Sequence, residues 1–165
     1  MRDFGLQDKV VVITGGGGAL GSAFARGFAD NGASLAILDF NLDKAKTTAT
    51  SFPAEKVKAT AVAADVSKDD QVARAVAEVV KYFGTIDILV NAAGVQIYPP
   101  KNIVDLEPGE WDLVVDICLK GMYICARHVV PILKAKGGGK IVNIASIAGH
   151  RGCPAARLTA RPRVA

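Results

Sequence analysis

One stretch decides the fold, Val10-Val11-Val12-Ile13-Thr14-Gly15-Gly16-Gly17-Gly18-Ala19-Leu20-Gly21. An apolar run leads into a glycine-rich turn, and an apolar-periodic segment follows from about Ala19. This order predicts a strand, a tight turn and a helix, the setting in which a glycine pattern indicates a nucleotide site. Glycines let a pyrophosphate approach the backbone, and the first helical N–H groups then point at the phosphates. A flexible surface turn that happens to be rich in glycine is the alternative interpretation.

An acidic residue ends a second apolar run, Ser34-Leu35-Ala36-Ile37-Leu38, because Asp39 follows it directly. A carboxylate about 20 residues past such glycines can accept hydrogen bonds from the adenosine ribose hydroxyls. It also repels a 2′-phosphate, so Asp39 predicts NAD in preference to NADP. A solvated aspartate at the end of a strand is the alternative.

Size and composition favour one globular domain, since the 165 residues are 50% hydrophobic and 22% charged. No apolar stretch approaches the ~20 residues that cross a bilayer, and the first residues lack the apolar core of a signal peptide. The three cysteines form no Cys-x-x-Cys motif, and no histidine cluster is present. We therefore expect no membrane span, no metal site, no disulfide framework and a reduced, cytoplasmic setting.

The net charge of +4 belongs to the end of the sequence. Basic and acidic residues balance over 1–150, whereas 151–165 adds arginines and no acid. Nucleic-acid binding needs a clustered basic surface with stacking aromatic residues, and 151–165 has no aromatic residue. We therefore expect a cofactor-binding domain over 1–150, an irregular basic tail over 151–165, and no nucleic-acid partner.

Apolar runs alternate with helical patterns along the chain. The candidate strands are 10–14, 35–38, 57–63, 86–90 and 141–145. Their apolar residues are continuous and do not alternate, which is typical of a parallel sheet covered on both faces. Repeated β-α-β units predict right-handed crossovers and a doubly wound, three-layer α/β/α fold of the Rossmann type. Ligands of such folds bind outside the carboxyl ends of the strands.

A long helix is expected from Glu110 to Lys136, and Pro131 is expected to bend it near its end. Its pattern is apolar on two faces, which indicates burial on both. One face would pack on the sheet. The other would pack on a second copy in a homo-oligomer, although a following helix of the same chain could cover it. A shorter helix is expected after an N-cap signal at Ser67-Lys68-Asp69-Asp70.

Three further motifs fall at strand ends: Asp65-Val66, Asn91-Ala92-Ala93-Gly94, and Ser146 within 140–149. Together with the glycine turn, they resemble the short-chain dehydrogenase/reductase family over about residues 6–150. Ala19 replaces the middle glycine of the family's turn. The cofactor-binding residues that this resemblance implies are Gly15, Gly17, Gly18, Ala19, Leu20, Gly21, Asp39, Asp65, Val66, Asn91, Ala92, Ala93 and Gly94.

The resemblance also implies a role for each motif. The glycine turn would hold the pyrophosphate, Asp39 the adenosine ribose, and Asp65-Val66 would flank the adenine. The motif from Asn91 to Gly94 would support the sheet and line the nicotinamide side. Ser146 would be catalytic and hydrogen-bond the substrate's carbonyl or hydroxyl. In structural terms alone, Asn91 could merely complete the hydrogen bonds of the sheet, and Ser146 could merely end a strand.

The family transfers a hydride between nicotinamide and an alcohol or carbonyl carbon, and a tyrosine assisted by a lysine moves the proton. The resemblance places this pair beyond Ser146, where the sequence has neither residue: the last tyrosine is Tyr123 and the last lysine is Lys140. Cys118 stands where the family has an asparagine tied to a proton relay. The binding half is thus predicted without the proton-transfer half.

Three hypotheses follow. The first is an NAD-dependent dehydrogenase or ketoreductase acting on a small alcohol or carbonyl substrate, of which this chain is a truncated or altered form that lacks the family's last strands and helices. Strand 141–145 would then be an exposed hydrophobic edge. The second is a pseudoenzyme that binds NAD and acts as a dimerisation module through the long helix. The third is a methyltransferase, against which the motif at 91–94 and Ser146 argue.

Overall fold

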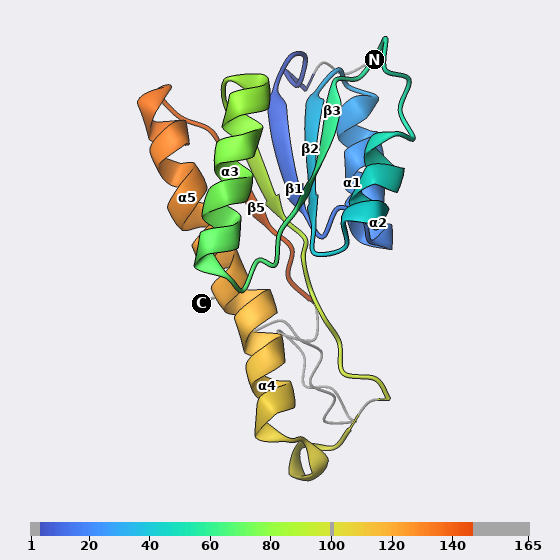
Figure 1. Cartoon of the computed structure of the whole chain (residues 1–165), viewed down its shortest axis with the longest axis vertical. Coiled ribbons are helices and arrows are strands. Elements are labelled where there is room, and N and C mark those ends of the chain that lie inside the picture. Colours follow the sequence, from blue (N-terminus) through green and yellow to red (C-terminus); the bar gives the residue numbers. More distant parts are fainter. Residues whose placement is uncertain (1–3, 100, 147–165) are drawn as a thin grey trace.

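The computed structural model describes residues 4–99 and 101–146, in which strands and helices alternate along the chain (Figure 1). The elements follow in this order: β1 (Val10–Thr14), α1 (Ala19–Ala29), β2 (Ser34–Asp39), α2 (Leu42–Ala49), β3 (Ala59–Ala63), α3 (Asp69–Phe83), β4 (Ile88–Asn91), the 3₁₀ turn η1 (Ile103–Asp105), α4 (Pro108–Val115), the π-helical turn η2 (Asp116–Lys120), α5 (Gly121–Ala135) and β5 (Lys140–Asn143).

The described strands form one parallel sheet in the order β3-β2-β1-β4-β5. The chain winds outward from β1 through β2 to β3 and then returns to the other side of β1 with β4. The winding direction therefore changes between β1 and β4, and the carboxyl ends of these two strands flank the switch point. The predicted doubly wound α/β sheet is confirmed.

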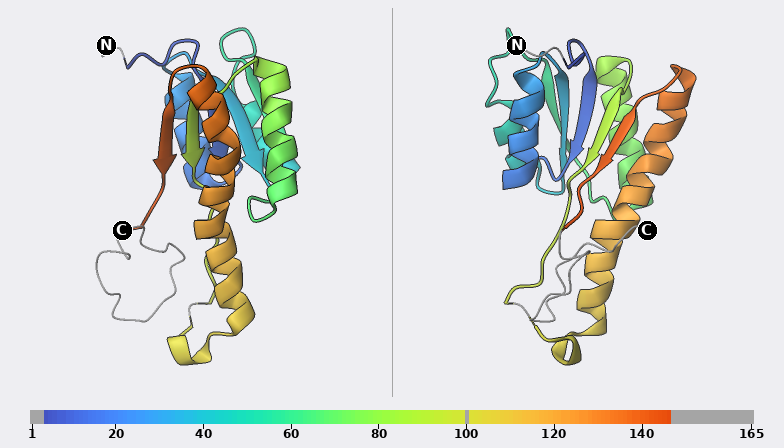
Figure 2. Two further views of the ribbon diagram at one scale, coloured as in Figure 1. Left: turned by 90° about the vertical axis from the view of Figure 1, so that its left-hand side faces the viewer. Right: turned by 180° about the vertical axis from the view of Figure 1, so that it is seen from behind.

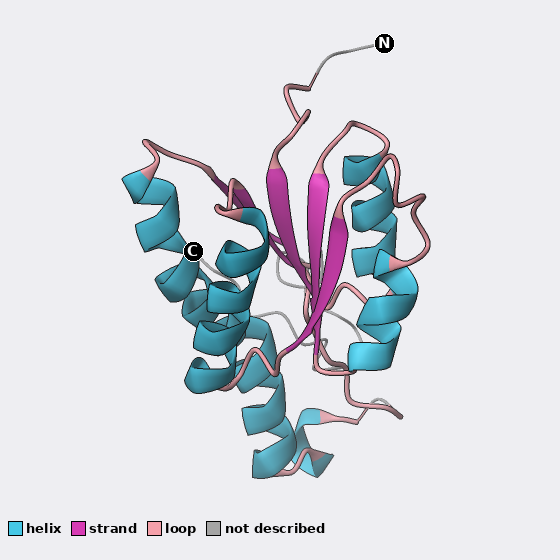
Figure 3. Cartoon of the chain, turned by 45° about the horizontal axis from the view of Figure 1, so that its top comes forward, coloured by secondary structure: helices cyan, strands magenta, loops and turns pink. Residues whose placement is uncertain are grey.

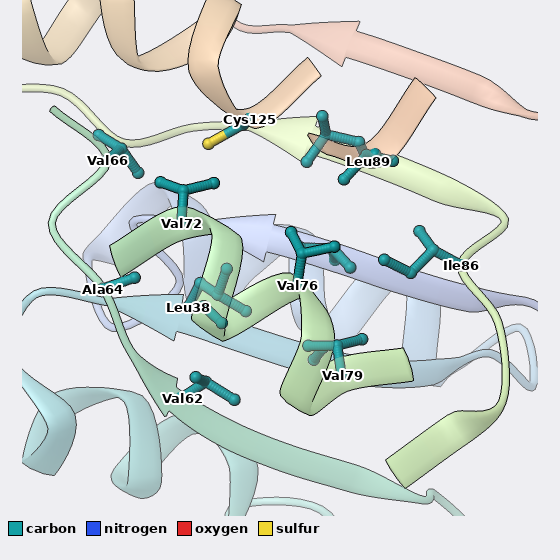
Figure 4. Close-up of a cluster of buried hydrophobic side chains, with 14 of the residues drawn as sticks. Leu38, Val62, Ala64, Val66, Val72, Val76, Val79, Ile86, Leu89 and Cys125 are labelled. Carbon is teal, nitrogen blue, oxygen red and sulfur yellow. The ribbon is translucent and has the colours of Figure 1, made fainter. Parts of the chain in front are cut away.

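Helices cover both faces of the sheet, with α1 and α2 on one side and α3 and α5 on the other (Figure 3). Val11 and Ile13 of β1 face α1 and α2, whereas Val10 and Val12 face α3 and α5. Because β1 is buried on both faces, its sequence is a continuous apolar run. Figure 4 shows the layer under α3, where Val72 and its neighbours pack against the sheet.

Several predicted boundaries need correction. The structure has β2 at Ser34–Asp39 and not 35–38, β4 at Ile88–Asn91 and not 86–90, and β5 at Lys140–Asn143 and not 141–145. Strand β3 begins at Ala59 and not at residue 57, because the N–H of Val57 closes a turn onto the carbonyl of Pro53 at 3.0 Å. The N-cap of α3 is Lys68, without a side-chain cap. The N–H and the hydroxyl of Ser67 instead donate to Oδ1 of Asp65, at 2.9 and 2.7 Å. Ser67 therefore closes a turn onto Asp65 instead of capping α3.

The predicted long helix is interrupted. It begins at Pro108, and a π-helical turn, η2, separates α4 from α5. Its buried side is formed by Val114, Cys118, Ile124, Cys125, Val129 and Leu133. Other large apolar side chains of the same stretch are 37 to 62% exposed, namely Trp111, Leu113, Leu119 and Tyr123. Figure 1 shows α4 projecting beyond the sheet at the end toward which the strands run.

Strand β5 forms one edge of the described sheet and pairs with β4 (Figure 2). Its four residues are exposed, with Ile141 at 37% and Val142 at 42%. The expected hydrophobic edge is therefore present in this part of the chain. Within the described residues, no helix has the length and apolar character that a membrane crossing requires. Residues 147–165, which include the expected basic tail, lie outside the described residues.

Candidate nucleotide-binding site

A cleft of about 630 Å³ opens at the carboxyl ends of β1 to β4. This is the switch point of the sheet, where doubly wound folds bind their ligands. The cleft is lined by Gly15, Gly18, Ala19, Leu20, Gly21, Asp39, Phe40, Lys44, Ala64, Asp65, Val66, Ala92, Ala93, Gly94, Val95, Leu113 and Ile117.

The predicted cofactor residues gather in this cleft with two exceptions. Gly17 packs against α2, and Asn91 is buried at 2% exposure, so neither lines the cleft. The predicted catalytic residue, Ser146, and Cys118, which stands at the family's asparagine position, are not among the lining residues either. Sequence reasoning also missed lining residues, among them Phe40, which follows Asp39 in the chain, and Lys44 in the first turn of α2.

The glycine turn brings the backbone close to the neighbouring segments. Gly15 has φ +65°, a backbone conformation that residues with a side chain rarely adopt. A Cβ at this position would lie 2.7 Å from the Cα of Ala93. A Cβ on Gly21 would overlap the carbonyl oxygen of Gly15, so α1 packs directly on the turn. A larger residue at either position would push the turn out of place.

The first turn of α1 suits an anion. Its N-cap, Gly18, provides no side-chain cap, and no acidic residue lies in the first turn. The N–H groups that begin a helix have no partner within the helix, and the helix dipole favours negative charge there. Ala19 and Leu20, the first two residues of α1, line the cleft. The arrangement can therefore hold a phosphate or pyrophosphate.

Gly16 is missing from the predicted set, yet it supports the turn. A Cβ at Gly16 would lie 2.6 Å from Cγ2 of Ile37. Its N–H donates to the carbonyl of Leu38 at 3.0 Å, and its carbonyl accepts the buried hydroxyl of Thr48 at 3.0 Å. The run of four glycines was the available signal for Gly16. Thr48 carried no signal in the sequence.

Asp39 is bound to the glycine turn. The residue is 7% exposed, Oδ2 accepts the N–H of Gly17 at 3.0 Å, and Oδ1 accepts the N–H of Asn41 at 3.0 Å. A carboxylate has acceptor capacity beyond two hydrogen bonds, and Asp39 lines the cleft. It can therefore accept a hydroxyl of a bound ligand while it fixes the end of β2 to the turn.

The ends of β1 and β4 are joined by a threonine. The hydroxyl of Thr14 accepts the N–H groups of Ala92 and Ala93, each at 3.1 Å. Asn91 donates from Nδ2 to Oδ1 of Asn143 at 2.8 Å and so connects β4 to β5. Its own Oδ1 is buried without a partner among the described residues. The hydrogen bond to β5 matches the structural alternative stated for Asn91.

Cys118 lies in η2 and contacts the segment that follows Gly94. The N–H of Val95 donates to its Sγ at 3.4 Å, and Sγ donates to the carbonyl of Val95 at 3.8 Å. The side chain is 1% exposed. Cys118 therefore ties the wall of the cleft to the π-helical turn, a type of turn that often occurs at functional sites.

A proton donor of the expected kind is not found at this cleft among the described residues. Tyr82, Tyr98 and Tyr123 are 48, 87 and 62% exposed, and none lines the cleft. The arrangement supports ligand binding and offers no tyrosine for acid–base chemistry.

With this geometry in place, comparison with known proteins identifies the family. The chain matches the family described as short chain dehydrogenase over residues 9–158. It belongs to that family of oxidoreductases. An NAD-dependent glycerol dehydrogenase of Listeria innocua is 36% identical over 145 residues, which cover 88% of this chain and 55% of that protein. The 3-oxoacyl-acyl-carrier-protein reductase FabG of Staphylococcus epidermidis is 34% identical over 149 residues, 90% of this chain and 60% of FabG.

Solved structures give the same result. An NAD⁺-bound xylitol dehydrogenase superposes with a TM-score of 0.86 at 32% identity, covering 92% of this chain and 58% of that one. A 3-ketoacyl-(acyl-carrier-protein) reductase from Brucella melitensis complexed with NADH superposes with a TM-score of 0.85 at 37% identity. The match covers 92% of this chain and 62% of that one. The chain thus spans 55 to 62% of the length of these four proteins.

Proposed function

We propose that this chain is the cofactor-binding part of a short-chain dehydrogenase/reductase that transfers a hydride between NAD and a small alcohol or ketone. One observation carries the proposal. The uncapped start of α1 and the carboxylate of Asp39 line one cleft and are joined through the N–H of Gly17. Similarity to the dehydrogenases and reductases named above supports the same assignment.

The residues present fit a dinucleotide. A Cβ at Gly15 or Gly21 would press on neighbouring backbone and displace the turn, and the cleft volume of about 630 Å³ is within the range of small-ligand sites. The N–H groups of α1 would hold the pyrophosphate, and Asp39 the adenosine ribose. Asp65 and Val66 would flank the adenine, and the segment from Ala92 to Gly94 would line the nicotinamide side. Bound nicotinamide supplies the hydride chemistry, and the chain orients it.

Asp39 supports a preference for NAD over NADP. A carboxylate at this position accepts the ribose hydroxyls and repels a 2′-phosphate. Its two backbone hydrogen bonds hold it in place, so the repulsion acts from a fixed position.

The chemical step is proposed to involve Ser146, which would hydrogen-bond the substrate's carbonyl or hydroxyl. The sequence beyond Ser146 contains neither tyrosine nor lysine. We therefore expect the 165-residue chain to bind NAD without turnover. We also propose a cytoplasmic setting and no nucleic-acid or membrane partner.

An NAD-binding pseudoenzyme is the second candidate. It is favoured by the apolar side chains that α4, η2 and α5 expose outside the cleft, among them Trp111, Leu119 and Tyr123. A second copy packing on the helix from Glu110 to Lys136 would cover them and form a homo-oligomer. A full-length form with turnover on alcohols or ketones would argue for the enzyme. Cofactor binding without turnover in that form would argue for the pseudoenzyme.

A glycine pair in α1 tests the binding proposal. In a fluorescence titration with NADH, Gly21→Ala is expected to abolish saturable binding, because its Cβ would overlap the carbonyl of Gly15. Gly27→Ala is the control, since nothing lies within 4 Å of a Cβ there. Circular dichroism would show that both variants fold. If Gly21→Ala bound NADH as tightly as Gly27→Ala did, the ligand would not sit on this turn.

A further inference from the structure

The linking segment between β4 and α4 contributes to one wall of the cleft. It comprises the described residues 95–99 and 101–107, runs outward beyond the sheet and turns back at η1 into α4 (Figure 1). Val95 of this segment lines the cleft together with Leu113 of α4 and Ile117 of η2. Because α4 projects beyond the sheet, the position of this wall depends on contacts between the linking segment and α4.

The strand order places this wall at the far end of the cleft from the proposed adenosine site. The sheet has the order β3-β2-β1-β4, Asp39 ends β2, and Asp65 follows β3. The glycine turn follows β1 and therefore lies between those acids and the end of β4. A dinucleotide with its adenosine at Asp39 and its pyrophosphate on the turn thus directs its nicotinamide half toward Val95. This step rests on the proposed function.

The inner part of the linking segment is held by apolar contacts and by a thiol. Val95 and Ile97 pack on a small buried cluster formed by Val114 and Cys118. The N–H of Val95 also donates to Sγ of Cys118 at 3.4 Å. Farther out, at η1, the segment exposes both of its apolar side chains, so apolar packing does not hold it there.

An ion pair holds the outer part of the segment. Nζ of Lys101 donates to Oε1 of Glu110 at 2.7 Å. Oε2 of the same carboxylate accepts the N–H of Glu107 at 3.0 Å, and the side chain of Glu107 accepts the N–H of Glu110 in return. Glu110 therefore joins Lys101, the end of the linking segment and the first turn of α4.

This ion pair is better shielded from water than a neighbouring one. The side chains of Lys101 and Glu110 are 34 and 28% exposed, whereas those of Lys120 and Asp116 within η2 are 53 and 43% exposed. The hydrogen bonds from Lys101 and from the N–H of Glu107 hold the pKa of the Glu110 carboxyl below its ordinary value. The carboxyl is therefore charged at neutral pH, and the pair persists there.

We infer that Lys101 and Glu110 are positioning residues, whose ion pair holds the linking segment against α4 and so fixes the wall that receives the nicotinamide half of the cofactor. Neither residue lines the cleft, so both act through the wall residues, among them Val95. Loss of the pair frees the outer part of the segment from α4 and leaves Asp39 and the glycine turn untouched. The nicotinamide half of the ligand should then lose affinity, and the adenosine half should not.

Two ligands separate the two ends of the cleft. ADP-ribose carries the adenosine, both phosphates and the second ribose, and NADH adds the dihydronicotinamide. Calorimetric titration of the 165-residue chain with each ligand gives a ratio of affinities that reports on the nicotinamide end. Lys101→Met removes the cation, whereas Glu110→Gln removes the anion and keeps an oxygen for the N–H of Glu107. We expect either variant to weaken NADH about threefold, the size of a partly exposed ion pair, and to leave ADP-ribose unchanged.

Three further variants control the result. The double variant Lys101→Met/Glu110→Gln should bind NADH no more weakly than either single variant, because both changes remove the same ion pair. Lys101→Arg keeps the charge and should keep the wild-type ratio. Lys120→Met is the matched control, since it breaks a lysine–carboxylate pair within η2 and does not touch the linking segment, and it should leave both affinities unchanged.

Each contrary outcome is distinct. Equal weakening of both ligands would mean that the ion pair supports the whole fold and not this wall, and unchanged affinities would mean that the wall does not depend on the pair. Additive losses in the double variant would mean that the two residues act separately. Each of these results overturns the inference. If the wild-type chain bound ADP-ribose as tightly as NADH, the wall would not receive the nicotinamide, and the inference would fail while the adenosine site stood. If the chain bound neither ligand, the proposed NAD site itself would fail.

Discussion

Oδ2 of Asp39 accepts the backbone N–H of Gly17 at 3.0 Å. The acid that ends β2 and the glycine turn that follows β1 are therefore one hydrogen-bonded unit. The same carboxylate that is proposed to select the ribose also fixes the turn that is proposed to hold the pyrophosphate. Changing the acid should affect both stability and cofactor choice.

Asp39→Asn tests this coupling. The amide keeps one acceptor oxygen, so one of the two backbone N–H groups loses its partner, and we expect a loss of about 1 to 3 kcal/mol in the free energy of unfolding. The preference for NADH over NADPH should fall as the negative charge disappears. Urea unfolding and titration with both dinucleotides measure the two effects. Asp43→Asn, at an exposed position of α2, should change neither the free energy of unfolding nor the preference for NADH. If Asp39→Asn changed both quantities no more than Asp43→Asn did, the coupling would be contradicted.

Thr48→Val tests the support of the turn from α2. The buried hydroxyl of Thr48 donates to the carbonyl of Gly16, and valine would leave that carbonyl without this partner. We expect a loss of about 1 to 3 kcal/mol in urea unfolding, together with weaker NADH binding. Thr47→Val removes an exposed hydroxyl from the neighbouring position and should cost less than about 0.5 kcal/mol. A Thr48 variant as stable as the Thr47 variant would rule out this role.

Asp87 should make stability depend on pH. Burial acts to raise the pKa of its carboxyl, but hydrogen bonds from Lys136 and the N–H of Val10, with the charges of Lys136 and Lys9, hold that pKa below its ordinary value. A depressed pKa in the folded state stabilises the fold above the unfolded pKa of about 3.9, and this contribution disappears as the pH falls through the folded value.

The measurement is the urea midpoint between neutral pH and acid, in wild type and in Asp87→Asn. Wild type should be the more stable at neutral pH by about 1 to 3 kcal/mol. The difference should shrink as the pH falls below about 4, where the carboxyl becomes protonated. Asp70→Asn serves as the exposed reference, because Asp70 pairs with Arg74 at the surface and should change stability by much less than the buried Asp87 does. Parallel pH curves for wild type and Asp87→Asn would contradict this account.

The two buried cysteines of the long helix should respond differently to valine. Cys118→Val removes the sulfur that accepts the N–H of Val95, and we expect a loss of about 1 to 3 kcal/mol and faster proteolysis near Val95. Burial raises the pKa of the Cys125 thiol to about 12, which makes it behave as a small apolar side chain. Cys125→Val should therefore cost less than about 1.5 kcal/mol. Thermal unfolding measures the stability of both variants. An equal loss of stability in the two would contradict the role of Cys118 in holding Val95.

The sequence predicted the sheet because its signals are local. The continuous apolar run at Val10–Thr14, the glycines behind it and the acid at Asp39 all lie within the first β-α-β unit. Burial of β1 on both faces then leaves a parallel sheet as the consistent arrangement. Most of the lining residues of the cleft could be predicted because the motifs that carry the family resemblance lie at strand ends and in the glycine turn.

Long-range contacts could not be predicted in this way. The hydrogen bond between Thr48 and Gly16 joins residues that are 32 positions apart in the sequence. The contact of Lys44 with Gly17 depends on how α2 packs against the glycine turn. The π-helical turn at Cys118 is also invisible in the periodicity, because the apolar pattern continues through it. Such features depend on tertiary packing, which overrides local preference.

Hydrogen exchange with and without NADH tests the central claim most directly, because it locates the bound cofactor on the chain. We predict that NADH slows exchange at the backbone N–H groups of the glycine turn and the first turn of α1, near residues 15–21, and at residues 91–95. Amides in α5 should be unaffected. If NADH protected none of the cleft segments, or protected only segments away from the cleft, the chain would not hold its cofactor at the switch point.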